Sequence, residues 1–430
     1  MKVEDTGLSA LLAAGRLPGV GMGLLSQRAL TERFVGLLGL VRSGRPAHMH
    51  TLFGSFLVPV TGADARGLLN AAVEAEALGT ADEVDPAGRR HRLPECAPLP
   101  EVPREFMELI GAAAEDAVEE LSGELTLGWS GAARRLARRL VLDAGEDTLL
   151  DRLAVGSGTE RADRRREDRR AALDRRIRWH LESLKPDCFA AMTGAGPHSP
   201  IAVDGLAHLL TAMIVTAETV GPRALALLAA DGYADRAHVE AAVRRAVGVW
   251  PEVFGVVQRV ARGFEWDGVE VGAGVEVLVL SSVLGKGGCV GDGGGVGEVE
   301  WQLSGLCAAP RRCVTRELAL AVTTELLVAA LANGRPQLLA PKLNPARPPA
   351  QLDPRRVRVE LLAFGAPPRL SGLEATAAEL EQHASALRDL AADQRWDHAD
   401  GLRTRGVLLG HARRCAVAAE DVRRTARALP

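Results

Sequence analysis

Apolar residues recur at helical spacing through the middle of the chain. Over residues 104–184 they lie three and four positions apart, which predicts a series of packed helices. Residues 203–230 are apolar nearly all round, so this stretch is predicted to be a central helix with a kink at Pro222. Another helix is predicted over residues 238–249, before a Trp-Pro turn.

Strand patterns are shorter and lie on both sides of this helical region. Residues 51–60 are rich in aromatic and β-branched side chains and predict a strand, which Pro59 confines to a sheet edge or a strand end. Farther along, alternating residues predict strands with turns at Asp267-Gly268 and Ala273-Gly274. Residues 79–103 are polar and contain prolines, so they are predicted to form an exposed loop.

Two further segments differ from the rest in composition. Residues 160–180 mix nine Arg with five acidic residues, which favours a solvated helix face joined by i,i+4 ion pairs over a basic docking stripe. In residues 285–301, eight of seventeen positions are Gly, but the spacing matches no phosphate-binding glycine motif. This segment is predicted to be a flexible connection.

The tail of the chain predicts a pair of helices. Leu373, Leu380 and Leu387 follow one another at seven-residue spacing, with Ala377 and Ala384 between them. A second helical stretch runs from about residue 400 to residue 428. A helical hairpin is therefore predicted, whose seam packs either on its own body or on a partner.

Composition narrows the class of protein. The 430 residues are 47% apolar and only 3% aromatic, so we expect a soluble protein whose core is packed from small and aliphatic side chains. Lys and Arg number 52 against 55 acidic residues, and this balance gives no basic field to attract nucleic acid. The abundance of Ala, Leu, Arg and Gly is typical of an actinobacterial genome.

The six cysteines and the apolar runs bear on location. The cysteines are scattered without a CxxC pair or a secretory leader, which favours reduced thiols in the cytoplasm. No apolar run is expected to reach the roughly 20 residues that span a bilayer, so no membrane segment is predicted. His48 and His50 are expected to be surface histidines, because no Asp or Cys completes a metal site around them.

The order of these pieces over residues 203–353 resembles the haem-thiolate cytochrome P450 superfamily. An apolar helix with an acid-Thr pair precedes a helix that ends at Trp-Pro, then come the GVEVGAG strand pair and a cysteine loop that leads into RELALAVTTELLVAAL. The resemblance covers residues 104–359 and extends more weakly toward the N-terminus. It implies a mainly α fold with small β-sheets over residues 1–370, divergent over 1–103, followed by the hairpin at 371–430.

The resemblance assigns roles around Cys313. The family motif F-x-x-G-x-R-x-C-x-G, aligned on this cysteine, retains only Arg311 and Cys313, while the Phe, first Gly and last Gly places hold Leu306, Ala309 and Thr315. In a conventional member, haem b would be held by the Cys313 thiolate at a helix N-terminus, where amides and the helix dipole stabilise the anion. Arg311 would bind a haem propionate.

Other family signatures are altered. The places of the E-x-x-R pair are held by Arg245 and Gly248. The place of the strand Arg that binds a propionate is held by Gln258, and the neighbouring Arg259 would have to bind the propionate instead. The segment between residues 280 and 303 is too short for the family's meander.

On the central helix, Glu218 and Thr219 keep the acid-alcohol pair that relays protons, while Thr216 stands where the family has Gly. Another register of the same helix places Glu218 over the pocket. The resemblance therefore makes Glu218 and Thr219 the candidate catalytic residues.

Three functions remain open on this basis. The first is a haem-free relative that acts as an auxiliary protein, similar to the P450-derived activators of glycosyltransferases in macrolide and anthracycline biosynthesis. It needs no cofactor, and its partner, a glycosyltransferase or another tailoring enzyme acting on a small natural-product intermediate, would bind through the C-terminal hairpin. The second is a haem-thiolate monooxygenase that uses Cys313. The third is a haem-independent cyclase, isomerase or dehydratase with Glu218 as acid or base.

Overall fold

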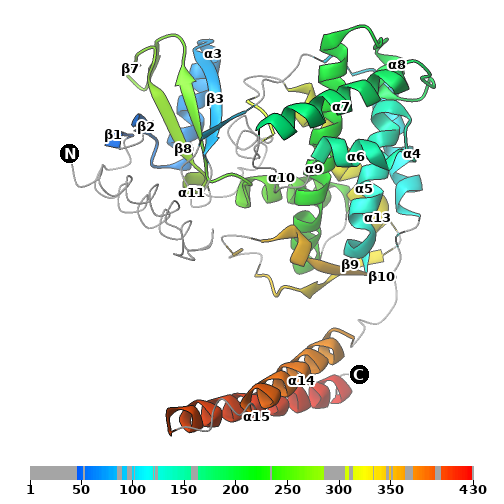
Figure 1. Cartoon of the computed structure of the whole chain (residues 1–430), viewed down its shortest axis with the longest axis vertical. Helices are drawn as coiled ribbons and strands as arrows, with labels where there is room; N and C mark the ends of the chain where they lie inside the picture. Colours follow the sequence, from blue (N-terminus) through cyan, green and yellow to red (C-terminus); the bar gives the residue numbers. More distant parts are fainter. Residues whose placement is uncertain are drawn as a thin grey trace. The chain divides into compact units, whose positions relative to one another are not determined.

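The computed structural model describes residues 46–428, except 52–53, 85–89, 94–98, 101, 120, 122–123, 156–162, 233–234, 285–305, 309–312, 333, 345–347, 350–351, 364–370 and 393–398. The chain divides into two compact units, with the boundary between Leu361 and Leu362. The predicted fold class is confirmed, because helices dominate the chain and the strands form small sheets (Figure 1).

Helix α9 (Pro200–Asp231) is the centre of the larger unit, and side chains are buried around nearly its whole circumference. It begins where the Ser199 side chain accepts a hydrogen bond from the amide of Ala202, and it ends at Gly232, whose φ of 78° suits a residue without Cβ. Packed against it are α5 (Leu125–Leu142), α10 (Arg236–Val249) and α13 (Val314–Leu331), while α4 (Arg104–Val118) packs against α5 and α13. The helical pattern predicted these elements correctly.

A close approach joins α5 to α9. The indole Nε1 of Trp129 donates a 2.7 Å hydrogen bond to the carbonyl of Ala217, inside the helical core. Gly221 lies one turn farther along α9, and a Cβ added there would lie 2.5 Å from the Trp129 ring. The glycine is therefore required for the indole to reach its acceptor.

The other helices within the described residues of this unit are short or lie at its surface. They are α3 (Gly62–Glu74), α6 (Thr148–Val155), α7 (Asp163–Leu181), α8 (Phe189–Met192), α11 (Ser281–Leu284) and the 3-10 helix η1 (Pro354–Arg356). The arginine-rich segment predicted to be a solvated helix forms α7, which confirms that prediction. The glycine-rich segment 285–301 lies outside the described residues.

A six-stranded sheet forms a second core with α3. Its strand order is β1-β2-β8-β5-β3-β4, and β2 pairs in parallel with β8 while the other neighbours are antiparallel. The strands are β1 (Ala47–Thr51), β2 (Gly54–Val58), β3 (Leu78–Val84), β4 (Arg90–Arg92), β5 (Gly255–Val260) and β8 (Glu276–Leu280). Two more pairs are β6 (Phe264–Trp266) with β7 (Val269–Val271), and β9 (Gly334–Ala340) with β10 (Arg358–Ala363).

Two expectations from the sequence are wrong here. Residues 79–103 were expected to form a loop, but they contain most of β3 and all of β4, because pairing with β5 satisfies their backbone and buries Ala81 and Val84. A membrane-spanning length was not expected, yet α9 is long and apolar enough to cross a membrane. Most of its apolar stretch is buried by neighbouring helices, as in the core helix of a globular protein.

The smaller unit contains the predicted hairpin of α14 (Ser371–Ala391) and α15 (Ala399–Ala428). The seam between these helices is made of alanines, which are the smallest side chains that still favour a helix. The buried ones are Ala377, Ala384, Ala391, Ala412 and Ala419. Arg423 pairs with Glu381 across the two helices.

Candidate functional site

Cys313 stands at the N-terminus of α13, as the resemblance implies. It is the N-cap residue of this helix, is only 3% exposed, and its Sγ accepts a hydrogen bond from the amide of Arg316 at 3.4 Å. An amide aimed at sulfur at a helix N-terminus is the arrangement that stabilises a thiolate. Arg311, the residue expected on a propionate, lies outside the described residues.

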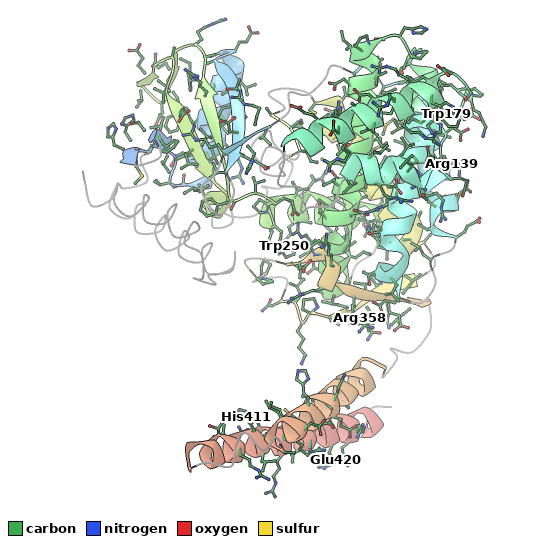
Figure 2. All side chains as sticks on the ribbon, viewed as in Figure 1. Arg139, Trp179, Trp250, Arg358, His411 and Glu420 are labelled. Atoms are coloured by element: carbon green, nitrogen blue, oxygen red, sulfur yellow. The ribbon has the colours of Figure 1, made fainter. Side chains whose placement is uncertain are left out.

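Around Thr216 and Thr219, one face of α9 is covered by protein. Thr216 and Thr219 face Trp250, which caps the end of α10 and is labelled in Figure 2, and Leu306 from the cysteine loop. The cavity that these residues enclose measures about 20 Å³. Pockets for drug-sized ligands measure roughly 300–1,000 Å³, so this cavity, which Cys313 does not line, is too small for a porphyrin.

The side chains of Glu218 and Thr219, the acid-alcohol pair of α9, point in different directions. Thr219 lines the small cavity, and its hydroxyl donates to the carbonyl of Val215 at 2.8 Å. Glu218 instead accepts a 2.5 Å hydrogen bond from the Nε of Arg134 on α5, and this carboxylate raises the pKa of the arginine. Neighbouring residues on a helix point about 100° apart, so the two side chains do not converge on one reacting atom.

The strand position that usually binds a propionate is also occupied differently. Gln258 is buried, and its Nε2 donates to the carbonyl of Gly79 at 3.1 Å, which joins β5 to β3. Arg259 is exposed, because successive side chains on a strand point to opposite faces of the sheet. Gln258 and Arg259 therefore point to opposite faces of the sheet, and only one of them could face a given propionate.

A buried arginine that the sequence reading missed joins three segments near the cavity. Arg223 on α9 is 7% exposed, and it donates to the carbonyls of Leu352 at 2.8 Å and Trp250 at 3.0 Å. It also forms an ion pair with Glu252. Arg245, at the family's E-x-x-R place, instead lies 3.7 Å from Asp231 near the surface.

The sequence does contain one indication that Arg223 has buried partners. A single Arg in the apolar run of α9 must find acceptors when it is buried. Its partners lie 27, 29 and 129 positions away, so no local pattern could have named them.

His208 is a second buried polar residue that the sequence reading missed. It lies on α9 with 7% exposure, and its Nε2 has no hydrogen-bond partner within the described ranges. Burial lowers the pKa of His208, and the nearby Cys313 opposes this shift without cancelling it. The imidazole is therefore neutral at physiological pH.

A surface cleft lies elsewhere, between the end of α5 and α7. There the carboxylate of Asp147 accepts hydrogen bonds from Arg176 at 2.6 Å and His180 at 2.8 Å, and it also caps α6 through the amide of Leu149. Burial works to raise the pKa of Asp147, but the bonds from Arg176 and His180 outweigh it and lower the pKa. The cluster holds α6 and α7 together.

Comparison with known proteins gives similarity of structure alone. No protein-family model matches the sequence, and no curated protein matches it. The solved structure of a mutant of the cytochrome P450 EryK in complex with erythromycin B is 15% identical, with a TM-score of 0.49 over 80% of this chain and 99% of that chain.

Two other solved structures are similar to the same degree. Cyanobacterial CYP120A1 with bound retinoic acid is 14% identical, with a TM-score of 0.47 over 76% of this chain and 94% of that one. CYP175A1 from a Thermus thermophilus strain is 15% identical, with a TM-score of 0.46 over 80% and 98%. At such identities the likeness to cytochromes P450 concerns the fold alone.

Proposed function

We propose that this chain is a haem-free, P450-like scaffold that acts as an auxiliary protein for a tailoring enzyme of bacterial natural-product biosynthesis. The observation that carries the proposal is the closure of α9 onto Trp250 and Leu306, which leaves a cavity of about 20 Å³. A macrocycle could enter only if these side chains moved apart by several ångströms. The residues that would then grip it are largely replaced.

The ion pair of Arg223 supports this reading because it holds the closed arrangement in place. The guanidinium joins α9 to the turn after α10 and to the segment before η1, and these parts border the closed cavity. Separating them would leave a buried cation without acceptors, which costs roughly 3–5 kcal/mol. The closed form therefore has its own support, independent of any cofactor.

The partner class follows from the resemblance. Haem-free relatives of P450 enzymes activate glycosyltransferases, so a glycosyltransferase is the partner we propose, with the small natural-product intermediate bound by that enzyme. We assign the binding of this partner to the C-terminal hairpin, because the hairpin belongs to a second compact unit of the chain. Among the charged residues of the hairpin are Arg413, Arg414 and Arg424 on α15.

A second candidate, a haem-thiolate monooxygenase, rests on the surroundings of Cys313. The amide of Arg316 still points at the Sγ of Cys313, as a thiolate ligand would require. A thiol at an N-cap accepts such a bond without any metal, so the observation fits both functions.

An absorption spectrum decides between the two. The purified protein, expressed with added haem precursor beside a known P450 as control, is reduced and exposed to carbon monoxide. We expect no Soret band from this chain, and we expect Cys313→Ala to leave its folding and its effect on the partner unchanged. A haem-thiolate Soret band that Cys313→Ala abolishes would overturn the proposal.

The auxiliary role needs a separate measurement. Turnover by a glycosyltransferase encoded in the same gene neighbourhood is measured with and without this chain, and co-purification is measured on a tagged copy. We expect both turnover and binding to depend on the chain. Turnover that is unchanged by the chain would remove the auxiliary role, even if the protein contains no haem.

A further inference from the structure

The C-terminal hairpin has one side without charged residues along both helices. On α14 this side consists of Leu380, His383, Leu387 and Leu390, spaced by three and four residues. On α15 it consists of Val407, Leu408, His411, Cys415, Ala418 and Val422, with the same spacing beyond Val407. We call these ten residues the neutral face.

Both stripes lie on the same side of the hairpin. Leu380 and Leu387 follow the seam residues Ala377 and Ala384 by three positions, and Cys415 and Val422 follow Ala412 and Ala419 by three as well. In two antiparallel helices, equal offsets from the seam point to the same face. Glu420, nine residues after His411 and so about half a turn away, belongs to the opposite, charged face; Figure 2 labels both.

The hairpin does not bury the neutral face by itself. Leu390 is 42% exposed, and Leu380, Leu387, Leu408, Cys415 and Val422 are half-buried at the edge of the seam. The seam contains alanines, which bury little apolar area, and two helices packed only through alanine gain little stability. In the described part of the larger unit, the exposed large apolar residues lie singly on six different elements.

The charges of the two helices indicate what covers this face. Helix α14 has four acidic residues and one Arg, whereas α15 has seven Arg and three acidic residues. A two-fold rotation can place the acidic α14 of each copy beside the basic α15 of the other, so the charges that border the neutral face are complementary between two copies. The same rotation brings the two neutral faces together.

We propose that the neutral face pairs with that of a second copy of this chain, forming a four-helix bundle from two hairpins. In such a bundle the half-buried leucines and Val422 become core residues, like the apolar positions of antiparallel bundles. The charged faces point outward and stay available to another protein. This inference does not depend on whether the chain binds haem or activates an enzyme.

The test compares two leucines that are about equally exposed in one hairpin. Leu390 lies on the neutral face with 42% exposure, and Leu409 lies on the charged side with 45%. Full-length wild type, Leu390→Glu and Leu409→Glu are compared by analytical ultracentrifugation, with circular dichroism as the measure of helix content.

We expect wild type and Leu409→Glu to sediment at twice the 45.5 kDa mass of one chain. Leu390→Glu would place a carboxylate in the bundle core and weaken the dimer at least about 100-fold, with helix content unchanged. A monomeric wild type at tens of micromolar would overturn the proposal. Equal behaviour of the two variants, whether both dimeric or both unfolded, would overturn it as well.

Discussion

Replacing Arg223 by Met tests the brace that holds the closed cavity in place. Methionine retains an unbranched apolar stem but has no donor, so the carbonyls of Leu352 and Trp250 lose the bonds of 2.8 and 3.0 Å that they now accept. Glu252 loses its ion pair as well, but it is partly exposed and regains water.

The cost can be worked from these three contacts. A buried carbonyl without a donor costs about 1–3 kcal/mol, and breaking a buried pair by removing one member costs about 3–5 kcal/mol in total. Stability of about 5–15 kcal/mol is typical of a folded protein, so this one substitution removes a large part of it. At about 1.3 °C per kcal/mol for a unit of 361 residues, the melting temperature falls by roughly 4–7 °C.

Arg245→Met is the matched control. Arg245 lies near the surface, 3.7 Å from Asp231, and an exposed pair of this kind contributes about 0–1 kcal/mol. Urea denaturation followed by circular dichroism gives the free energy of unfolding for both variants. If Arg223→Met and Arg245→Met lose the same stability, or if Arg223→Met loses less than about 1 kcal/mol, the reasoning about the brace is wrong.

Two further predictions concern the packing of α9. Gly221→Ala destabilises the protein by about 1–3 kcal/mol, because the new Cβ would lie 2.5 Å from the buried Trp129 ring, whereas Gly131→Ala on α5, where a Cβ meets nothing within 4 Å, is neutral or stabilising in the same urea titration. Burial lowers the pKa of His208, so the unfolded chain binds its proton first, and stability is lost as the pH falls through about 6.5. His208→Leu therefore flattens the fall in unfolding free energy between pH 7 and pH 5, and an unchanged slope would contradict this assignment.

Local patterns predicted the elements whose stability is local. The continuous apolar stretch of α9, the helical pattern of α10 and the seven-residue leucine spacing of α14 located these helices, because burial leaves such patterns in the sequence. Strand β3 was missed because its partner β5 lies far along the chain, and the backbone bonds between them leave no mark on the largely polar side chains of β3.

The candidate site was less predictable for the same reason. The place of Cys313 at a helix N-terminus followed from the residues around it. By contrast, the directions of Glu218 and Thr219 depend on Arg134 and Leu306, which come from other parts of the chain. Sequence alone gives the residue types at such a site, whereas tertiary packing decides which of them meet.

The closed cavity and the missing haem signatures are consistent with a single physical constraint. A dry hole in a core costs about 24 cal/mol per Å³, so an empty pocket of about 300 Å³ would cost roughly 7 kcal/mol, comparable with the stability of a whole domain. Under the proposed function, a chain that gains no binding energy from a macrocycle must fill the space. Thr216 in place of glycine does so here together with Leu306 and Trp250, and Arg223 fixes the walls that they form. Under the proposed function, Thr216→Gly opens a void without restoring haem binding, because the E-x-x-R pair and the strand arginine of the family are still replaced.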